Sequence, residues 1–281
     1  MKRREFITLL GGSAAAWPLA ARAQQPAMPV VGFLSGGTAS GWQSFLTGFR
    51  GGLNQAGFAE GRNVAVEYRW AEGDYDRLPA LAADLIKHGV TVIFANGGNT
   101  PALAAKAATQ TIPIVFETGG DPVKAGLVAS LNRPGGNVTG VSWTASALSA
   151  KRLGILHQLV PKASVVGLLV NPDYQEVNVQ VRELKDAAAA IGVQTDAAMA
   201  NTADSIDKAF TSFVDKRIAA VFVANDPFIA VHRAQIIALA ARHAMPTIYP
   251  LREDVVAGGL ISYGTSLRPV PASRPLRRTN P

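Results

Sequence analysis

The feature that most constrains the fold of this chain is a repeated alternation between two kinds of segment. Short apolar runs rich in β-branched residues are each followed by an alanine- and leucine-rich segment with helical spacing. The run Thr91–Ala95 is apolar almost throughout, as expected of a strand buried on both faces. Because parallel strands need helical crossovers between them, the alternation predicts an α/β fold with parallel sheets covered by helices.

The alternation divides into two units, with a break near Trp143–Ser149. In the first unit the expected strands are Val30–Leu34, Val64–Trp70, Val90–Ala95, Ile114–Glu117 and Val138–Ser142, and the expected helices are Gly41–Ala56, Tyr75–Lys87, Thr100–Thr109 and Pro122–Ser130. In the second unit the expected strands are Val165–Val170, Val193–Ala197, Val221–Ala224, Thr247–Tyr249 and Leu260–Ser262, and the expected helices are Ser146–Leu159, Asn178–Ala190, Ala203–Lys216 and Phe228–Ala244. The prediction is therefore two Rossmann-like lobes, at residues 26–145 and 146–267.

Residues 1–25 have the three parts of an export signal. A basic N-terminal region at Lys2–Arg4 is followed by a short apolar run. After this run, Ala21–Ala23 has the small-x-small pattern of a signal-peptidase cleavage site. The paired arginines with Phe6 two positions later favour a twin-arginine signal over an ordinary secretory signal. We therefore expect cleavage near Ala23 and a mature protein in the periplasm.

Composition excludes several classes of function. The net charge of +7 is carried by the first 23 and the last fourteen residues, so the body between them is neutral and nucleic acid is not an expected partner. The chain has no cysteine, which excludes a thiol nucleophile and a cysteine metal site. After the signal, no apolar stretch approaches the length of a membrane span. Residues 268–281 hold four prolines and four arginines without periodicity, and we expect them to be disordered.

Small polar residues follow the expected strands, at the sheet edge where open α/β folds bind ligands. The candidate ligand-binding residues are Ser35, Gly36, Asn96, Gly97, Gly98, Thr100, Thr118, Gly119, Asp121, Asn171, Asp226 and Tyr249. For each turn taken alone, an ordinary turn or helix N-cap is an alternative interpretation. The recurrence of the same residue types in both units favours one shared cleft.

The residue types indicate how a ligand would be held. Gly97, Gly98 and Thr100 are predicted to bind a carboxylate through backbone amides and a hydroxyl. Asp121 or Asp226 would face an ammonium group if the ligand is an amino acid. Tyr249, or alternatively Tyr174, would form an aromatic wall.

Catalytic signatures are missing from the sequence. No G-x-G-x-x-G, phosphate-binding loop or G-x-S-x-G motif occurs, and the four histidines fall in or at the ends of expected helices without metal spacing. We therefore expect a binding protein with no cofactor and no metal, whose two lobes close on a small molecule. An exported α/β enzyme acting on a small carboxylate and a ligand-binding partner of a sensor are the alternatives.

Several segments resemble one known family: Arg3–Ile7, Glu67–Gly73, Asp76–Pro79, Gly119–Val123, Leu131–Gly140 and Ser262–Gly264. They are similar to the ABC transporter substrate-binding proteins of the tryptophan/tyrosine type, and the resemblance covers residues 1–267. It implies a type I periplasmic-binding-protein fold, an aromatic or branched amino acid or related carboxylate as ligand, and a membrane permease as partner of a monomeric protein. Members of this family continue beyond Leu267 with a further helix and strand, so residues 268–281 suggest an incomplete C-terminus of the fold.

Overall fold

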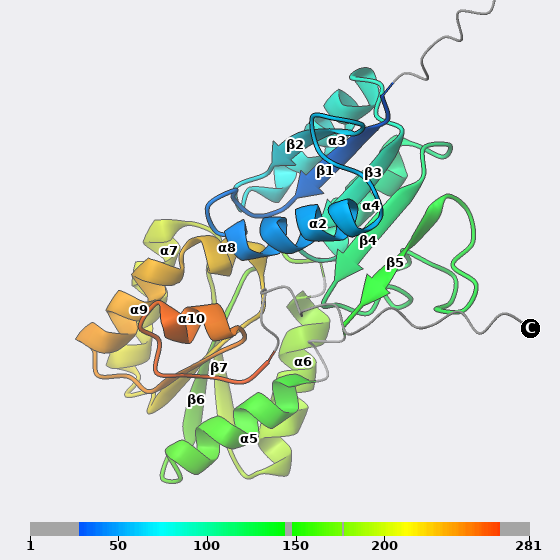
Figure 1. Cartoon of the computed structure of the whole chain (residues 1–281). Coiled ribbons are helices and arrows are strands. Elements are labelled where there is room, and N and C mark those ends of the chain that lie inside the picture. Colours follow the sequence, from blue (N-terminus) through cyan, green and yellow to red (C-terminus); the bar gives the residue numbers. More distant parts are fainter. Residues whose placement is uncertain (1–27, 144–147, 176, 265–281) are drawn as a thin grey trace, which may run out of the picture.

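The computed structural model describes residues 28–143, 148–175 and 177–264 and has two α/β lobes (Figure 1). The predicted export signal at 1–25 and the predicted disordered tail at 268–281 lie outside the described residues. No helix within the described ranges is long and apolar enough to cross a membrane.

The first lobe is built on a five-stranded parallel sheet of order β2-β1-β3-β4-β5. Its strands are β1 (Val30–Ser35), β2 (Ala65–Trp70), β3 (Val92–Asn96), β4 (Ile114–Thr118) and β5 (Val138–Ser142), and its helices are α2 (Gln43–Gln55), the 3₁₀ turn η2 (Tyr75–Arg77), α3 (Leu78–Lys87) and α4 (Asn99–Ala108). Phe33 of β1 packs edge-on against Phe49 of α2, with ring centroids 5.3 Å apart. The neighbouring Gly32 faces the opposite side, where a Cβ would lie 3.1 Å from Leu85 of α3. Helices therefore cover both faces of this sheet.

The second lobe repeats the arrangement, with strand order β10-β9-β8-β6-β7 and parallel pairing throughout. Its strands are β6 (Val165–Val170), β7 (Gln194–Met199), β8 (Ala220–Val223), β9 (Thr247–Tyr249) and β10 (Ile261–Ser262), and its helices are α5 (Ser149–Leu159), α6 (Val177–Ala190), α7 (Ala203–Asp215), α8 (Pro227–Val231), α9 (Arg233–Arg242) and α10 (Arg252–Val256). A Cβ at Gly167 of β6 would lie 2.8 Å from the fully buried ring of Phe213. A glycine at this position lets α7 pack directly on β6, which is an interior strand of the sheet.

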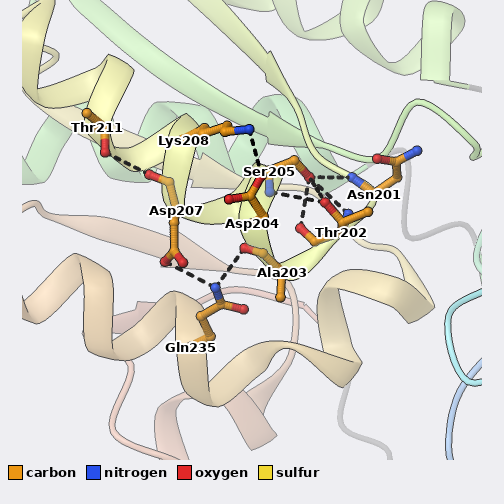
Figure 2. Close-up of polar contacts among 9 residues, drawn as sticks. All are labelled: Asn201, Thr202, Ala203, Asp204, Ser205, Asp207, Lys208, Thr211 and Gln235. Atoms are coloured by element: carbon orange, nitrogen blue, oxygen red, sulfur yellow. Dashed lines mark hydrogen bonds and ion pairs between the residues drawn. The ribbon is translucent and has the colours of Figure 1, made fainter.

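Polar contacts join α7 to α9 on one side of this lobe (Figure 2). Thr202 Oγ1 accepts a hydrogen bond from the Ser205 N–H, and the Ser205 hydroxyl oxygen accepts one from the Thr202 N–H, which forms a capping box at the start of α7. Gln235 of α9 donates from Nε2 to the Ala203 carbonyl at 2.8 Å and to Asp207 Oδ1 at 3.1 Å. The side chain of Gln235 thus fixes the position of α9 against the first turns of α7.

Three predicted elements need correction. The helix predicted at Pro122–Ser130 is wrong: the chain makes turns there, because Gly126 has φ +70° and the N–H groups of Leu127 and Val128 both donate to the Pro122 carbonyl. The helix predicted at Phe228–Ala244 is divided into α8 and α9 at His232, whose Nδ1 contacts the Phe228 carbonyl at 3.0 Å. The five-residue helix α10 was not predicted, because so short a segment has no readable helical period.

Candidate functional site

A pocket of about 440 Å³ lies between the two lobes, at the carboxyl ends of both sheets. The first lobe contributes Trp42, Gly97, Gly98, Gly119, Gly120 and Trp143, and the second contributes Tyr174, Asn225, Asp226, Pro227, Ala230 and Leu251. Most of these residues lie within four residues after the end of a strand, which is the region where parallel α/β sheets bind ligands. The lining combines three large aromatic side chains with the backbone of four glycines.

Glycines shape the first-lobe side of the pocket. Gly97 and Gly98 have φ of +91° and +105°, in the region that strongly favours glycine, and Gly98 is the N-cap of α4. Among the described residues no side chain caps this helix, and its N-terminus, the positive end of the helix dipole, adjoins the pocket at a place suited to an anion. A Cβ at Gly37 would lie 1.9 Å from Trp42 Nε1. The Trp42 ring can therefore pack at this position only because residue 37 has no side chain.

A buried polar network supports the same side of the pocket. Glu117, at the end of β4, accepts hydrogen bonds from Trp143 Nε1 and, at 2.6 Å, from Asn96 Nδ2. Asn96 Oδ1 in turn accepts from the hydroxyl of the fully buried Ser35. Burial raises the pKa of Glu117, against the opposing effect of the hydrogen bonds from Trp143, Asn96 and the Gly97 N–H. The network fixes the orientation of the Trp143 indole and of the Gly97 turn.

Asp226 is the buried carboxylate of the second-lobe side. Its Oδ1 accepts from Asn171 Nδ2 and from the Ile229 N–H, both at 3.2 Å, and its Oδ2 accepts from the Tyr75 hydroxyl at 2.6 Å. Burial raises the pKa of Asp226, and the hydrogen bonds from Tyr75, Ile229 and Asn171 oppose that shift. Asp226 thus caps α8 and joins the two lobes, as well as lining the pocket.

The predicted site residues separate into three groups. Gly97, Gly98, Gly119 and Asp226 line the pocket. Behind this lining lie buried supporting residues, which are Ser35, Gly36, Asn96, Thr118 and Asn171. The remaining predicted residues, Thr100, Asp121 and Tyr249, are outside the lining of this pocket.

Each residue of the third group has another environment. Asp121 Oδ1 accepts from the N–H groups of Val123 and Lys124, so its side chain caps a turn, which is the alternative that local sequence leaves open. Tyr249 lies in β9, is 2% exposed and lines a neighbouring chamber. The Thr100 hydroxyl is buried at the start of α4 without a hydrogen-bond partner among the described residues.

The predicted set lacks several residues of the site. They include two tryptophans of the lining, Trp42 and Trp143, and two residues of the hydrogen-bond networks, Tyr75 and Glu117. The other lining residues outside the predicted set are Gly120, Asn225, Pro227, Ala230 and Leu251. Trp143 directly follows the predicted strand Val138–Ser142, so the same strand-end rule applied to aromatic residues would have found it. Glu117 is the last residue of a predicted strand and is the only ionisable residue within it. Tyr75 and Trp42 give no such signal, because their roles depend on contacts with distant parts of the chain.

The two lobes contact each other around the pocket. Besides the Tyr75–Asp226 hydrogen bond, Pro227 of α8 lies close to the backbone of Gly36 and Gly97, where added Cβ atoms would be 3.6 and 3.4 Å away. Lys124 Nζ also approaches Glu183 Oε1 at 3.5 Å on the exposed surface. Within the described residues, no cluster of three or more histidine, aspartate or glutamate side chains has an arrangement that could hold a metal ion.

Comparison with known proteins identifies the family. The model of the ABC transporter substrate binding protein family matches residues 30–269. This chain belongs to that family. The two parallel α/β lobes agree with the predicted type I periplasmic-binding-protein fold, which the leucine-binding protein of Thermotoga maritima shares with a TM-score of 0.57. The family consists of substrate-binding proteins and not of enzymes, in agreement with the expectation from the sequence.

A tyrosine-binding protein of Clostridioides difficile is 31% identical over 218 residues, which are 77% of this chain and 62% of that protein. The chain thus spans less than two thirds of the length of this curated relative. Among solved structures, an ABC domain from Streptococcus pneumonia in complex with L-Trp is 23% identical and superposes with a TM-score of 0.73, covering 83% of this chain and 77% of that one. The ligand-free, open structure of a substrate-binding protein with adhesive properties from Clostridium difficile is 28% identical, with a TM-score of 0.53 and the same coverage.

Proposed function

We propose that this chain is the substrate-binding component of an ABC importer and that it binds a small aromatic carboxylate, such as an aromatic amino acid, between its lobes. The observation that carries the proposal is the composition of the interlobe pocket. Three aromatic side chains and an uncapped helix N-terminus line one cavity, which matches a ligand with a ring at one end and a carboxylate at the other.

The carboxylate would bind at the Gly97–Gly98 turn. The positive end of the α4 dipole favours a negative charge there, by about 0.3–1 kcal/mol when exposed and more when buried. Glu117 stabilises the turn from behind by accepting from the Gly97 N–H. Asp226 on the other lobe stays the predicted partner of an ammonium group, because it is the acidic residue of the pocket lining.

The aromatic ring would be enclosed by Trp42, Trp143 and Tyr174. Aromatic pairs add about 0.5–1.5 kcal/mol beyond the burial of their surface, so these walls favour a ring over an aliphatic side chain. The name of the tyrosine-binding relative supports this ligand class.

Closure of the lobes would be the mechanism. Ligand contacts from both lobes exist together only when the lobes are closed, so the ligand shifts the population toward the closed state. The interlobe contacts at Asp226 and Pro227 support a closed arrangement. This chain superposes less well on the ligand-free, open relative (TM-score 0.53) than on the L-Trp complex (TM-score 0.73), which supports a lobe arrangement different from that of the open relative.

The cellular setting completes the proposal. Residues 1–25 would direct export, with cleavage near Ala23, and the mature monomer would act in the periplasm, where the closed form docks on a membrane permease. The lobes would comprise residues 26–145 and 146–267, as the sequence predicts.

A ligand panel tests the proposed function. Tyrosine, tryptophan, phenylalanine, leucine and benzoate are added separately to the purified protein, and thermal unfolding and calorimetric affinity are measured. At 100 times the dissociation constant, a true ligand should add about 2.7 kcal/mol to the free energy of unfolding. Phenylalaninamide, which lacks the carboxylate, is the matched control and should bind much more weakly than phenylalanine. Stabilisation by none of the aromatic ligands, or conversion of one of them to product, would overturn the proposal.

A further inference from the structure

A second, smaller chamber adjoins the interlobe pocket inside the second lobe. The two cavities share the lining residues Asn225, Asp226, Ala230 and Leu251, so the chamber begins at the second-lobe wall of the pocket. The Gly97–Gly98 turn lies on the opposite, first-lobe wall. A ligand whose carboxylate binds at that turn would therefore direct its far end toward the chamber.

The chamber contains one ion pair in a largely apolar setting. Arg233 of α9 donates from Nε to Asp254 Oδ1 of α10, and these side chains are 16% and 6% exposed. Asp254 Oδ2 also accepts from the Leu251 N–H at 3.0 Å. The rest of the lining includes the apolar side chains of Ile229 and Ile236. A polar ligand group entering here would meet Arg233 and Asp254 together.

One nitrogen of the Arg233 guanidinium donates no hydrogen bond within the described residues. Its Nη2 atom is buried and has no hydrogen-bond partner among the described residues. Buried donors are nearly always satisfied in native proteins, and one without a partner calls for an explanation. A guanidinium donor of this kind is suited to an oxygen atom of a bound ligand.

We propose that this chamber is a specificity subsite in which Arg233 recognises a hydroxyl group on the ring of the ligand. This inference rests on the proposed function, since it concerns the far end of the same ligand. A hydroxyl fits better than a second carboxylate, because Asp254 and Asp226 both line the chamber and would repel an anion. A hydroxyl can accept from Arg233 and donate to Asp254, so it suits both members of the pair.

The test compares tyrosine with phenylalanine, which differ only in the ring hydroxyl, by calorimetry on the wild-type protein and on Arg233→Lys. Lysine keeps a cation beside Asp254 but removes the second donor of the guanidinium. We expect the wild type to bind tyrosine at least tenfold more tightly than phenylalanine and Arg233→Lys to lose most of that ratio, with phenylalanine affinity changed by less than about twofold. Arg252→Lys, at an exposed arginine two residues before Asp254, is the matched control and should keep the ratio.

A second measurement needs no variant. 4-Methylphenylalanine has the size of tyrosine but cannot form the hydrogen bond, and it should bind the wild type no better than phenylalanine. Equal binding of the methyl and hydroxyl ligands, or an unchanged tyrosine-to-phenylalanine ratio in Arg233→Lys, would overturn the subsite while leaving the proposed function intact. Failure of the wild type to bind any aromatic ligand would overturn the proposed function and the subsite with it.

Discussion

The hydroxyl of Tyr75, in the first lobe, donates a hydrogen bond of 2.6 Å to Asp226 Oδ2, in the second. Both residues are buried, with exposed fractions of 7% and 4%, and they are separated by 151 positions in the chain. Burial, reinforced by the charge of Asp226, raises the pKa of Tyr75 well above its ordinary value, so the phenol keeps its proton and stays a donor. In the lobe closure proposed above, this hydrogen bond would form only when the lobes come together, and it would contribute to the free energy of closure.

Replacing Tyr75 with phenylalanine should weaken ligand binding. The variant leaves a buried carboxylate oxygen without its donor in the closed state, whereas water can solvate that oxygen in the open state. Hydrogen bonds to charged groups are worth about 1.5–3 kcal/mol, so the dissociation constant should rise roughly tenfold or more. Calorimetry gives the affinity, and small-angle scattering gives the fraction of open molecules.

The control for this variant is Tyr68→Phe. The Tyr68 hydroxyl donates to Glu60 on the exposed side of the first lobe, whereas Asp226 lies in the second lobe. Its removal should leave ligand affinity within about twofold of the wild type. Equal affinities for Tyr75→Phe and Tyr68→Phe would show that the interlobe hydrogen bond does not influence closure.

Glu117→Gln should destabilise the protein and weaken binding of aromatic ligands. Trp143 Nε1 donates to Oε1 of Glu117 and Asn96 Nδ2 donates to Oε2, and glutamine replaces one of these two acceptor oxygens with an NH2 donor. One buried donor is left without an acceptor, which costs on the order of 1–3 kcal/mol. Thermal unfolding measures the loss, and tryptophan fluorescence reports the environment of Trp143. Glu72→Gln, at a side chain that is 64% exposed, should change stability little; similar losses for both variants would contradict the role of Glu117.

Stability should fall as the pH rises above the ordinary carboxyl range. Burial raises the pKa of Asp226, Glu117 and Asp254, so at mildly acidic pH the folded protein holds protons that the unfolded chain has released. The unfolding free energy therefore decreases with pH from about 4 until the raised pKa values have been passed, and then levels off. The hydrogen bond from Arg69 lowers the pKa of Asp84 and acts in the opposite direction, but this carboxyl is solvent-exposed and its effect is screened.

Denaturant unfolding between about pH 4 and pH 8 measures this dependence. Asp226→Asn removes one of the titrating groups and should flatten the slope. A stability that rises with pH over this range, with the same slope in the variant, would contradict the raised pKa values.

The strands were predictable because buried parallel strands leave a strong local signal. Val165–Val170 and Val138–Ser142 have the predicted bounds, and the polar turns after strands do meet at one pocket edge. Local sequence does not distinguish an aspartate that contacts a ligand from one that caps a turn or a helix. The Asp121 side chain caps a turn, whereas Asp226 caps α8 and also lines the pocket. The aromatic walls and the Tyr75 contact depend on how the two lobes meet, which no single segment encodes.

Gly36→Val should oppose closure of the lobes. It should act through steric crowding and not through backbone strain. Gly36 has no positive φ, but an added Cβ would lie 3.0 Å from Tyr75 Cε1 and 3.6 Å from the Pro227 ring of the other lobe. The two methyl groups of valine beyond that Cβ would displace the Tyr75 ring and crowd Pro227, and such overpacking costs about 1–3 kcal/mol.

The crowding against Pro227 acts only when the lobes are together, whereas the crowding against Tyr75, in the same lobe as Gly36, acts in both states. Ligand affinity should therefore drop, because Pro227 is crowded and the displaced Tyr75 hydroxyl no longer reaches Asp226, and the melting temperature of the ligand-free protein should also fall. Gly52→Ala is the matched control, since nothing lies within 4 Å of a Cβ at Gly52 on the exposed side of α2 and alanine favours the helix. Because the contact between Gly36 and Pro227 lies beside the Tyr75–Asp226 hydrogen bond, the double variant Gly36→Val with Tyr75→Phe should lose less affinity than the two single losses combined. Fully additive losses would mean that the two contacts act on closure independently.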